Sequence, residues 1–185
     1  MTEQEKIITQ TKQWIIDVVI GCNFCPFAAR EVKRGTIAYK VVEYVNSKQI
    51  IATLLQAVAE LESNETIETT LVIIPVGVEK FTKYLQLVVK AEDALIQNGF
   101  EGIYQLASFH PNYLFSNSSV NDAANYTNRS PYPMLHLLRE ASLTKAIASH
   151  PNVDNIPATN IAFANSKGLA YMKLLRDTSI ILLNK

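Results

Sequence analysis

The chain has 185 residues, of which 48% are hydrophobic and 18% are charged. This composition is typical of a globular protein that buries a sizeable core, and it excludes an intrinsically disordered chain. The 17 basic and 17 acidic residues cancel, and no basic cluster extends beyond 30-REVKR-34. Nucleic acid is therefore excluded as an expected partner.

The first segment predicts an amphipathic helix over about 3–20, because apolar residues such as Trp14 and Val18 recur at helical steps. The apolar run 14-WIIDVVIGC-22 is interrupted by an aspartate and is too short for a membrane span. It also lacks the layout of a signal peptide. We therefore expect a cytoplasmic protein without a membrane partner, folded as a single domain over 1–185.

The following segments alternate between two kinds of pattern. Stretches rich in β-branched and aromatic residues predict strands, and stretches with apolar residues at three- and four-residue steps predict helices. The elements expected in chain order are a strand over 36–45, a helix over 47–63, a strand over 69–76, a helix over 79–98 and a strand over 103–109.

This alternation indicates an α/β fold, because strands joined through helices pair in parallel. We predict a single-domain sandwich with a small, mostly parallel or mixed sheet and flanking helices. The alternative is a ferredoxin-like α+β fold, which would require an antiparallel hairpin.

The rest of the chain predicts mainly helix. A leucine-rich helix is expected over 133–149, with a proline in its first turn. A last helical region follows over 158–177, and 179-SIILL-183 is read as a short edge strand.

The segment between residues 110 and 132 is dense in amides and hydroxyls. Loops of this length in compact proteins are often functional, so we predict a binding site here. Asn125 and Asn128 can donate and accept hydrogen bonds, and Arg129 lies beside the expected helix start, where free backbone amides favour an anion. The alternative for Arg129 is a pairing with an acid of the protein.

Two histidines are candidate acid–base groups. His110 directly follows a buried strand, where ligands of α/β sheets gather, although its ring could instead cap a carbonyl at the strand end. His136, Arg139 and Glu140 lie at i, i+3 and i+4, which places them on one face of the expected helix. Glu140 would orient the imidazole and Arg139 would bind an anionic group, unless this face is only a solvated surface. We expect these groups, with Asn128 and Arg129, to converge around one cleft.

The two cysteines form a C-x-x-C pair at 22 and 25. A helix starting at Pro26 would lower the pKa of the Cys25 thiol and favour the thiolate. Alternatively, Cys22 and Cys25 could join His110 and His136 in a tetrahedral zinc site, or the cysteines could simply pack as small apolar residues.

Three motifs, CPFA at 25–28, FHPNY at 109–113 and NYTNRSPYPMLHLLRE at 125–140, resemble an uncharacterised, mainly bacterial family known as domain of unknown function 1415. The resemblance covers most of the chain but implies no reaction. This sequence departs from the family pattern at Cys22, where the family is expected to have an apolar residue. The departure disfavours a dithiol or a zinc site that uses both cysteines. The motif positions are Cys25, Pro26, His110, Asn125, Asn128, Arg129, His136, Arg139 and Glu140.

Together these patterns predict a protein that binds a small anionic metabolite. If the protein is an enzyme, it would also transform this metabolite. The alternative is a binding or interaction protein stabilised by zinc or iron, without catalysis. The sequence leaves the reaction, the cofactor and the oligomeric state open. The expected catalytic residues are His110, His136, Glu140 and Cys25, and the expected ligand-binding residues are Asn125, Asn128, Arg129 and Arg139, with no metal ligand assigned.

Overall fold

The computed structural model of the chain describes residues 1–43, 46–149 and 153–181. Its centre is a four-stranded mixed sheet with the strand order β1-β2-β4-β3. β1 and β2 are parallel, whereas β4 runs antiparallel to both of its neighbours, β2 and β3. The strands are β1 (Ile37–Val41), β2 (Thr69–Ile73), β3 (Tyr104–Phe109) and β4 (Met134–Arg139).

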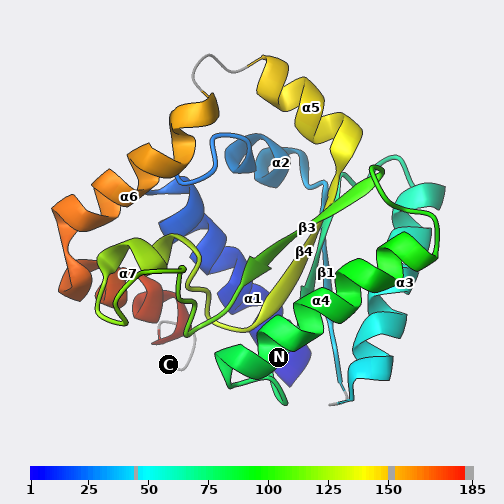
Figure 1. Ribbon diagram of the computed structural model, residues 1–185, viewed down its shortest axis with the longest axis horizontal. Coiled ribbons are helices and arrows are strands. Elements are labelled where there is room, and N and C mark those ends of the chain that lie inside the picture. The colour runs from blue at the N-terminus through cyan, green and yellow to red at the C-terminus, as the bar shows by residue number, and fades with distance from the viewer. Residues whose placement is uncertain (44–45, 150–152, 182–185) are drawn as a thin grey trace.

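Helices cover both faces of this sheet (Figure 1). α3 (Ser47–Ser63) and α4 (Phe81–Gln97) lie on one face. α1 (Glu3–Trp14) lies on the other, and its last turn widens into a π-helix over Ile15–Ile20. The remaining helices are α2 (Ala28–Arg34), η2 (Ala123–Thr127), α5 (Glu140–Ala148), η3 (Val153–Asn155), α6 (Ile156–Lys167) and α7 (Leu169–Ile181).

The α/β fold class is confirmed, with the sheet mixed rather than wholly parallel. The first three strands alternate with helices along the chain, as predicted: α3 connects β1 to β2, and α4 connects β2 to β3. The order β1-α3-β2-α4-β3-β4 differs from the β-α-β-β-α-β order of the ferredoxin-like alternative, because a helix separates β2 from β3.

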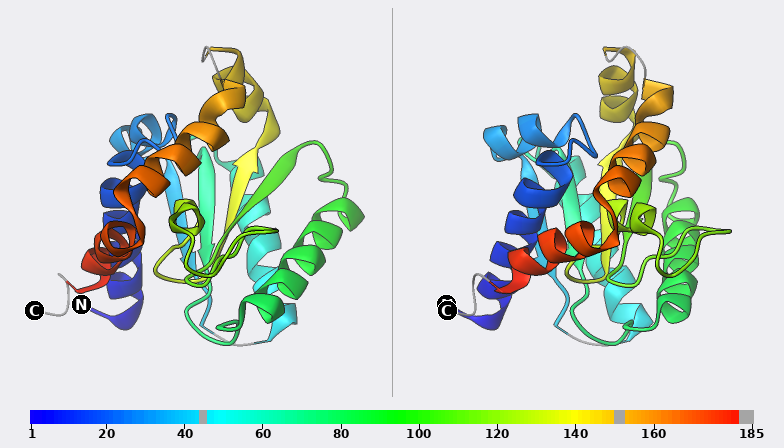
Figure 2. Two further views of the ribbon diagram at one scale, coloured as in Figure 1. Left: turned by 60° about the vertical axis from the view of Figure 1, so that its left-hand side comes forward. Right: turned by 90° about the vertical axis from the view of Figure 1, so that its left-hand side faces the viewer.

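Side chains of the sheet alternate between two hydrophobic cores, because successive residues of a strand point to opposite faces. Leu135 and Leu137 of β4 pack in the core below α3 and α4. Met134 packs in the opposite core, which contains Trp14 of α1 and Met172 of α7. Figure 2 shows the two helical layers on either side of the strands.

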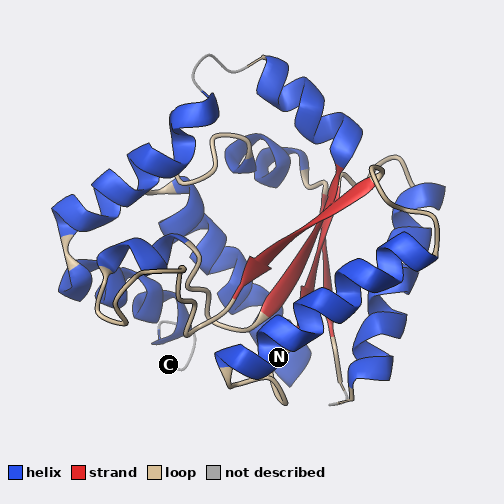
Figure 3. Cartoon of the chain, in the orientation of Figure 1, coloured by secondary structure: helices blue, strands red, loops and turns tan. Residues whose placement is uncertain are grey.

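The helix predicted over 133–149 is wrong in its first half. Residues Met134–Arg139 form the central strand β4, and only Glu140–Ala148 is helical (Figure 3). The apolar run MLHLL predicts a helix because leucine and methionine favour helices, and because the prolines before this run suit the first turn of a helix. A strand covered on both faces shows no alternation of apolar and polar residues, so tertiary pairing with β2 and β3 decided its structure.

The C-terminal region also differs from the prediction. The helical region expected over 158–177 is two helices, which separate at Gly168, where the backbone adopts φ +79°. Residues 179–181 of the predicted edge strand belong to α7, and residues 182 and 183 lie outside the described part. Within the described ranges, no helix has the length and apolarity needed to cross a membrane.

Candidate ligand-binding site

The predicted convergence of His110 with His136 on one cleft is wrong, although Arg139 belongs, with His136, to the lining of one cavity described below. Because β4 is a strand, His136 and Arg139 point to opposite faces of the sheet, three residues apart. The His110 ring packs on the α4 side, with ring centroids 5.3 Å from Phe81 and 5.0 Å from Tyr84. The His136 ring instead lies on the α1 side, 6.1 Å from the Phe109 ring.

His110 is a core residue with both ring nitrogens occupied. It is 0% exposed, its Nε2 lies 2.9 Å from the carbonyl oxygen of Val78, and its Nδ1 accepts from the backbone amide of Asn112 at 2.9 Å. A carbonyl can only accept, so Nε2 carries the proton. Burial is the main reason that the pKa of His110 lies below its ordinary value, although the Val78 hydrogen bond and the charge of Glu79 oppose it. This geometry matches the alternative in which the ring caps a carbonyl at the strand end.

The polar loop satisfies its own hydrogen bonds. Arg129 donates from Nε to the carbonyl of Tyr113 and from Nη2 to that of Val120, both at 3.0 Å, and its guanidinium stacks on Tyr126. Asn125 is buried, accepts from the amide of Phe115 and donates to the carbonyl of Ser119. The predicted anion site at a helix start is absent because a strand begins there, and Arg129 pairs with carbonyls rather than with an acid.

Asn128 serves the same network. Its Nδ2 donates to the carbonyl of Ser108 at 3.2 Å, and its Oδ1 accepts from the hydroxyl of Thr127 at 3.0 Å. Its own carbonyl accepts from the amide of His110. Of the three side chains predicted to bind a ligand from this loop, Asn125 and Arg129 therefore hold the loop together, and Asn128 connects it to the end of β3.

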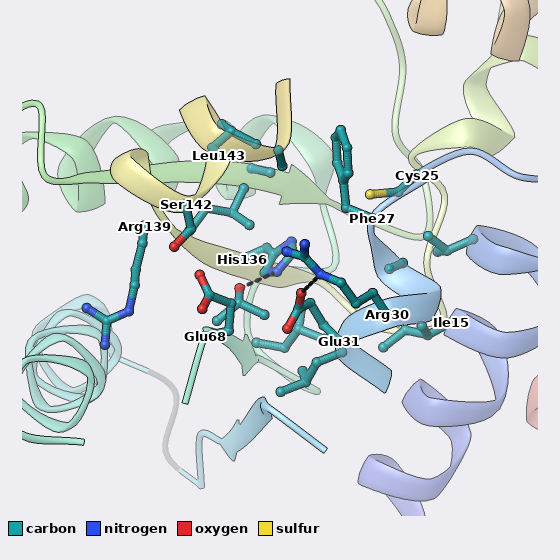
Figure 4. A pocket seen from close by; sticks show the side chains of 18 of the residues that line it. Ile15, Cys25, Phe27, Arg30, Glu31, Glu68, His136, Arg139, Ser142 and Leu143 are labelled. Carbon is teal, nitrogen blue, oxygen red and sulfur yellow. Dashed lines mark hydrogen bonds and ion pairs between the residues drawn. The ribbon is translucent and has the colours of Figure 1, made fainter. Parts of the chain in front are cut away.

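Among the described residues, neither Arg139 nor Glu140 forms a hydrogen bond with the imidazole that they were expected to assist. Arg139 donates to the hydroxyl of Tyr104 at 3.2 Å and to the carbonyls of Leu61 and Ile67, near the end of α3. In Figure 4 its guanidinium points away from His136. Glu140 begins α5, where its backbone amide donates to the carbonyl of Ile103.

A cavity of about 240 Å³ lies on the opposite face of the sheet, between the strands, the end of α1, α2 and α5. Figure 4 shows the side chains that surround it. Its walls are mainly apolar, and the sheet contributes one side chain with a ring nitrogen, His136 of the central strand. The lining includes Trp14, Ile15, Val19, Cys25, Phe27, Arg30, Glu31, Ile37, Glu68, Thr69, Leu71, Ala107, Phe109, His136, Leu138, Ser142 and Leu143.

Thr69 fixes the tautomer of His136. The Thr69 hydroxyl donates to the carbonyl of Leu137 at 2.6 Å, and its oxygen lies 2.6 Å from Nε2 of His136. Since this hydroxyl has one hydrogen, the histidine must donate from Nε2, which leaves Nδ1 unprotonated. Burial lowers the pKa of His136 to about 4, so the imidazole is neutral at pH 7.

Charged residues of the cavity lining lie on α2, directly before β2 and, with Arg139, at the end of β4. Glu31 accepts from Nε of Arg30 and from the hydroxyl of Thr36, both at 2.6 Å. Burial alone would raise the pKa of Glu31, but these hydrogen bonds and the charges of Arg30 and Arg34 hold it below its ordinary value. The Arg30 side chain is 57% exposed and therefore lies at the mouth of the cavity.

Two buried polar atoms of the lining residues have no hydrogen-bond partner in the described structure. They are Nε1 of Trp14, a residue 1% exposed, and Oε1 of Glu68. Figure 4 shows the Glu68 carboxylate beside His136, on the side of Ser142. A buried donor or acceptor without a partner costs about 1 to 3 kcal/mol, so each such atom calls for an account.

Cys25 lines the same cavity, and its sulfur is directed toward it in Figure 4. Burial raises the pKa of the Cys25 thiol, and the backbone amides of Phe27 and Ala28 only partly oppose this effect. The prediction of a stabilised thiolate is therefore wrong. Cys22 packs in the core on the α1 side, and burial raises the pKa of its thiol too.

The zinc site proposed from Cys22, Cys25, His110 and His136 does not form, because the two histidine rings lie on opposite sides of the sheet. Among the described residues, no three His, Cys, Asp or Glu side chains gather as metal ligands would.

Sequence reasoning found three cavity residues, Cys25, His136 and Arg139, and missed Trp14, Arg30 and Glu68. A signal for Glu68 was present, since a carboxylate directly before the buried strand 69-TTLVI-73 must lie at the edge of a core. Arg30 belongs to the basic cluster noted in the sequence. For Trp14 the sequence indicated only a buried helical face.

Fold and cavity together define an α/β protein with a mixed sheet and a largely apolar cavity on one face of it. The model of a family described as a protein of unknown function, DUF1415, matches residues 6–174. The chain therefore belongs to this family, as its motifs predicted. Neither the search of curated proteins nor the search of solved structures found a match.

Proposed function

We propose that the protein binds a small molecule with a compact apolar body in the cavity beside His136. The observation that carries this proposal is the combination of an apolar space of about 240 Å³ with lining residues whose buried polar atoms have no partner among the described residues. Ligand sites are typically apolar cavities with a few placed polar groups. The volume lies just below the roughly 300 to 1,000 Å³ of sites for drug-sized ligands, which favours a smaller molecule.

We place an anionic end of this ligand at the mouth, beside Arg30. The amides and the guanidinium that the sequence offered for an anion, in Asn125, Asn128 and Arg129, are engaged within the loop. Arg30 is exposed and has donors beyond the Nε that binds Glu31. A carboxylate there would gain a charge-assisted hydrogen bond without burial of its charge.

The chain provides its own reporter for this proposal, because Trp14 is its single tryptophan and lines the cavity. We expect cyclohexanecarboxylate and cyclohexanone to change its fluorescence in a saturable way, after correction against free tryptophan for the weak absorption and quenching by the ketone carbonyl. The carboxylate should bind more tightly, and Arg30→Met should remove that advantage while cyclohexanone binding remains.

A matched pair of variants tests the location. Ala107→Leu adds three carbons to the cavity wall, and Ala59→Leu makes the same change on an exposed position of α3. Binding should be lost in the first and kept in the second. Absence of any saturable change in the wild type, or equal binding by both variants, contradicts the proposal.

A further inference from the structure

The free nitrogen of His136 specifies a chemical property of the ligand. Resting on the proposed function, we infer that the ligand carries a hydroxyl or amino group that donates a hydrogen bond to Nδ1 of His136. With an anionic end at Arg30, the ligand class is a hydroxy or amino carboxylic acid with a compact apolar body.

The inference follows from the count of hydrogens at Thr69. The Thr69 hydroxyl donates its single hydrogen to the carbonyl of Leu137, so its oxygen can serve His136 only as an acceptor. The imidazole must then keep its proton on Nε2. Nδ1 is left as an acceptor, and no residue of the described chain donates to it.

Of the two buried lining atoms without a described partner, the one on a carboxylate favours the same polarity, whereas Nε1 of Trp14 is a donor and would take an acceptor of the ligand. Oε1 of Glu68 is a second acceptor without a partner among the described residues, and Glu68 lines the same cavity. Cavity walls formed by Leu71, Phe109 and Leu138 offer no donor. A ligand that presents a donor to His136 and Glu68 therefore satisfies acceptors that the protein leaves open, whereas a ligand with acceptors alone can satisfy only Nε1 of Trp14.

Cyclohexanol and cyclohexanone test this directly, because the two have the same ring and differ in whether the oxygen can donate. Titration of the Trp14 fluorescence should show cyclohexanol binding up to about tenfold more tightly, as one extra hydrogen bond allows. The affinity of cyclohexylamine, compared with that of cyclohexanol, shows whether the site prefers an amino or a hydroxyl donor. Equal binding of the alcohol and the ketone to the wild type overturns the inference.

Two variants separate the role of the tautomer from that of the cavity. His136→Phe should bind both compounds equally, because the acceptor is gone and the apolar walls remain. Thr69→Val should also lose the preference, because the imidazole is then free to move its proton to Nδ1, whereas Thr69→Ser should retain it. Thr69 is a positioning residue in this scheme, and ¹⁵N shifts of His136 should report Nε2 protonation in the wild type and a tautomer mixture in Thr69→Val.

The outcomes distinguish this inference from the proposed function. If cyclohexanone binds with an affinity equal to that of cyclohexanol, the cavity is a ligand site without donor selectivity. If neither compound changes the fluorescence, the proposed function fails as well. A preference that survives in His136→Phe or Thr69→Val, each shown by circular dichroism to be folded, also overturns the inference.

Discussion

Two regions of the molecule each contain a neutral histidine that carries its proton on Nε2. One is the loop between residues 110 and 132, and the other is the cavity on the opposite face of the sheet. In the loop region, His110 has a carbonyl on one nitrogen and an amide on the other. In the cavity, His136 has a threonine on one nitrogen and no described partner on the other. The loop has more polar groups, but they satisfy one another. The density of polar residues in this protein thus marks a loop that is internally bonded, whereas the groups without described partners lie in the cavity.

Loss of Arg129 should have the largest effect on stability. Arg129→Met keeps the length of the side chain but leaves the carbonyls of Tyr113 and Val120 without donors. We expect the free energy of unfolding, measured by urea titration, to fall by about 3 kcal/mol. Arg30→Met, at an exposed position, should change it by less than about 1 kcal/mol. Were Arg129→Met as stable as the wild type but unable to bind a ligand, the loop would be a binding site after all.

Replacing each histidine by phenylalanine compares the two regions directly. His110→Phe leaves the carbonyl of Val78 and the amide of Asn112 without partners, which should cost about 2 kcal/mol or more. His136→Phe removes only a donor to Thr69, whose hydroxyl still donates to Leu137, so the cost should stay below about 1 kcal/mol. Thermal and urea unfolding of both variants would check this order, and equal losses would contradict it.

The pH dependence of stability should carry a contribution from His136. Its pKa is about 4 in the folded protein, below the value near 6.5 of an unfolded chain. The unfolded state therefore binds more protons as the pH falls from about 6.5 toward 4, and stability is lost in that window. We expect this contribution to reach about 2 kcal/mol near pH 5. His110, whose pKa is also lowered, acts in the same direction.

The variant His136→Phe isolates the contribution of His136. Its free energy of unfolding should fall less steeply between pH 6.5 and 4.5 than that of the wild type, in urea titrations at constant ionic strength. Identical slopes would mean that the imidazole of His136 is solvated rather than buried.

The smallest effect is expected at Glu68. Glu68→Gln replaces a carboxylate whose Oε1 is buried without a described partner. The amide is easier to bury than the charge, so stability should stay the same or rise by up to about 1 kcal/mol. A marked loss of stability would show that the carboxylate is engaged in the folded protein. Asn128→Ala, in the saturated loop, is the matched change and should be destabilising.

The elements up to residue 109 were predictable because their apolar patterns are local. α3, for example, places Ile50, Leu54 and Val58 at helical steps, and the structure buries all three. β4 was not predictable in this way. Its sequence MLHLLR has no alternation, and its partners Thr69–Ile73 and Tyr104–Phe109 lie far away along the chain. Helical propensity was the stronger local signal, and tertiary pairing overrode it.

The error in β4 also explains the error in the candidate site. Helical spacing grouped His136 with Arg139, whereas strand geometry places them on opposite faces. The sequence identified Cys25 and His136 as chemically capable groups, and the structure brings both to one cavity. Which polar groups are already satisfied depends on backbone carbonyls such as Leu137 and Val120, and no sequence pattern reports these.

The position of β4 has a consequence for how the protein is made. β3 takes its place in the sheet only through β4, which follows it in the chain by more than twenty residues. On a ribosome that adds about 5 to 20 residues per second, β3 waits on the order of seconds for its neighbour to be synthesised. During that interval one edge of β2 and the whole of β3 are open to pairing with other chains. The nascent protein can therefore misassemble until residue 139 has emerged. The last strand to join the sheet, β4, lies between β2 and β3 and not at an edge.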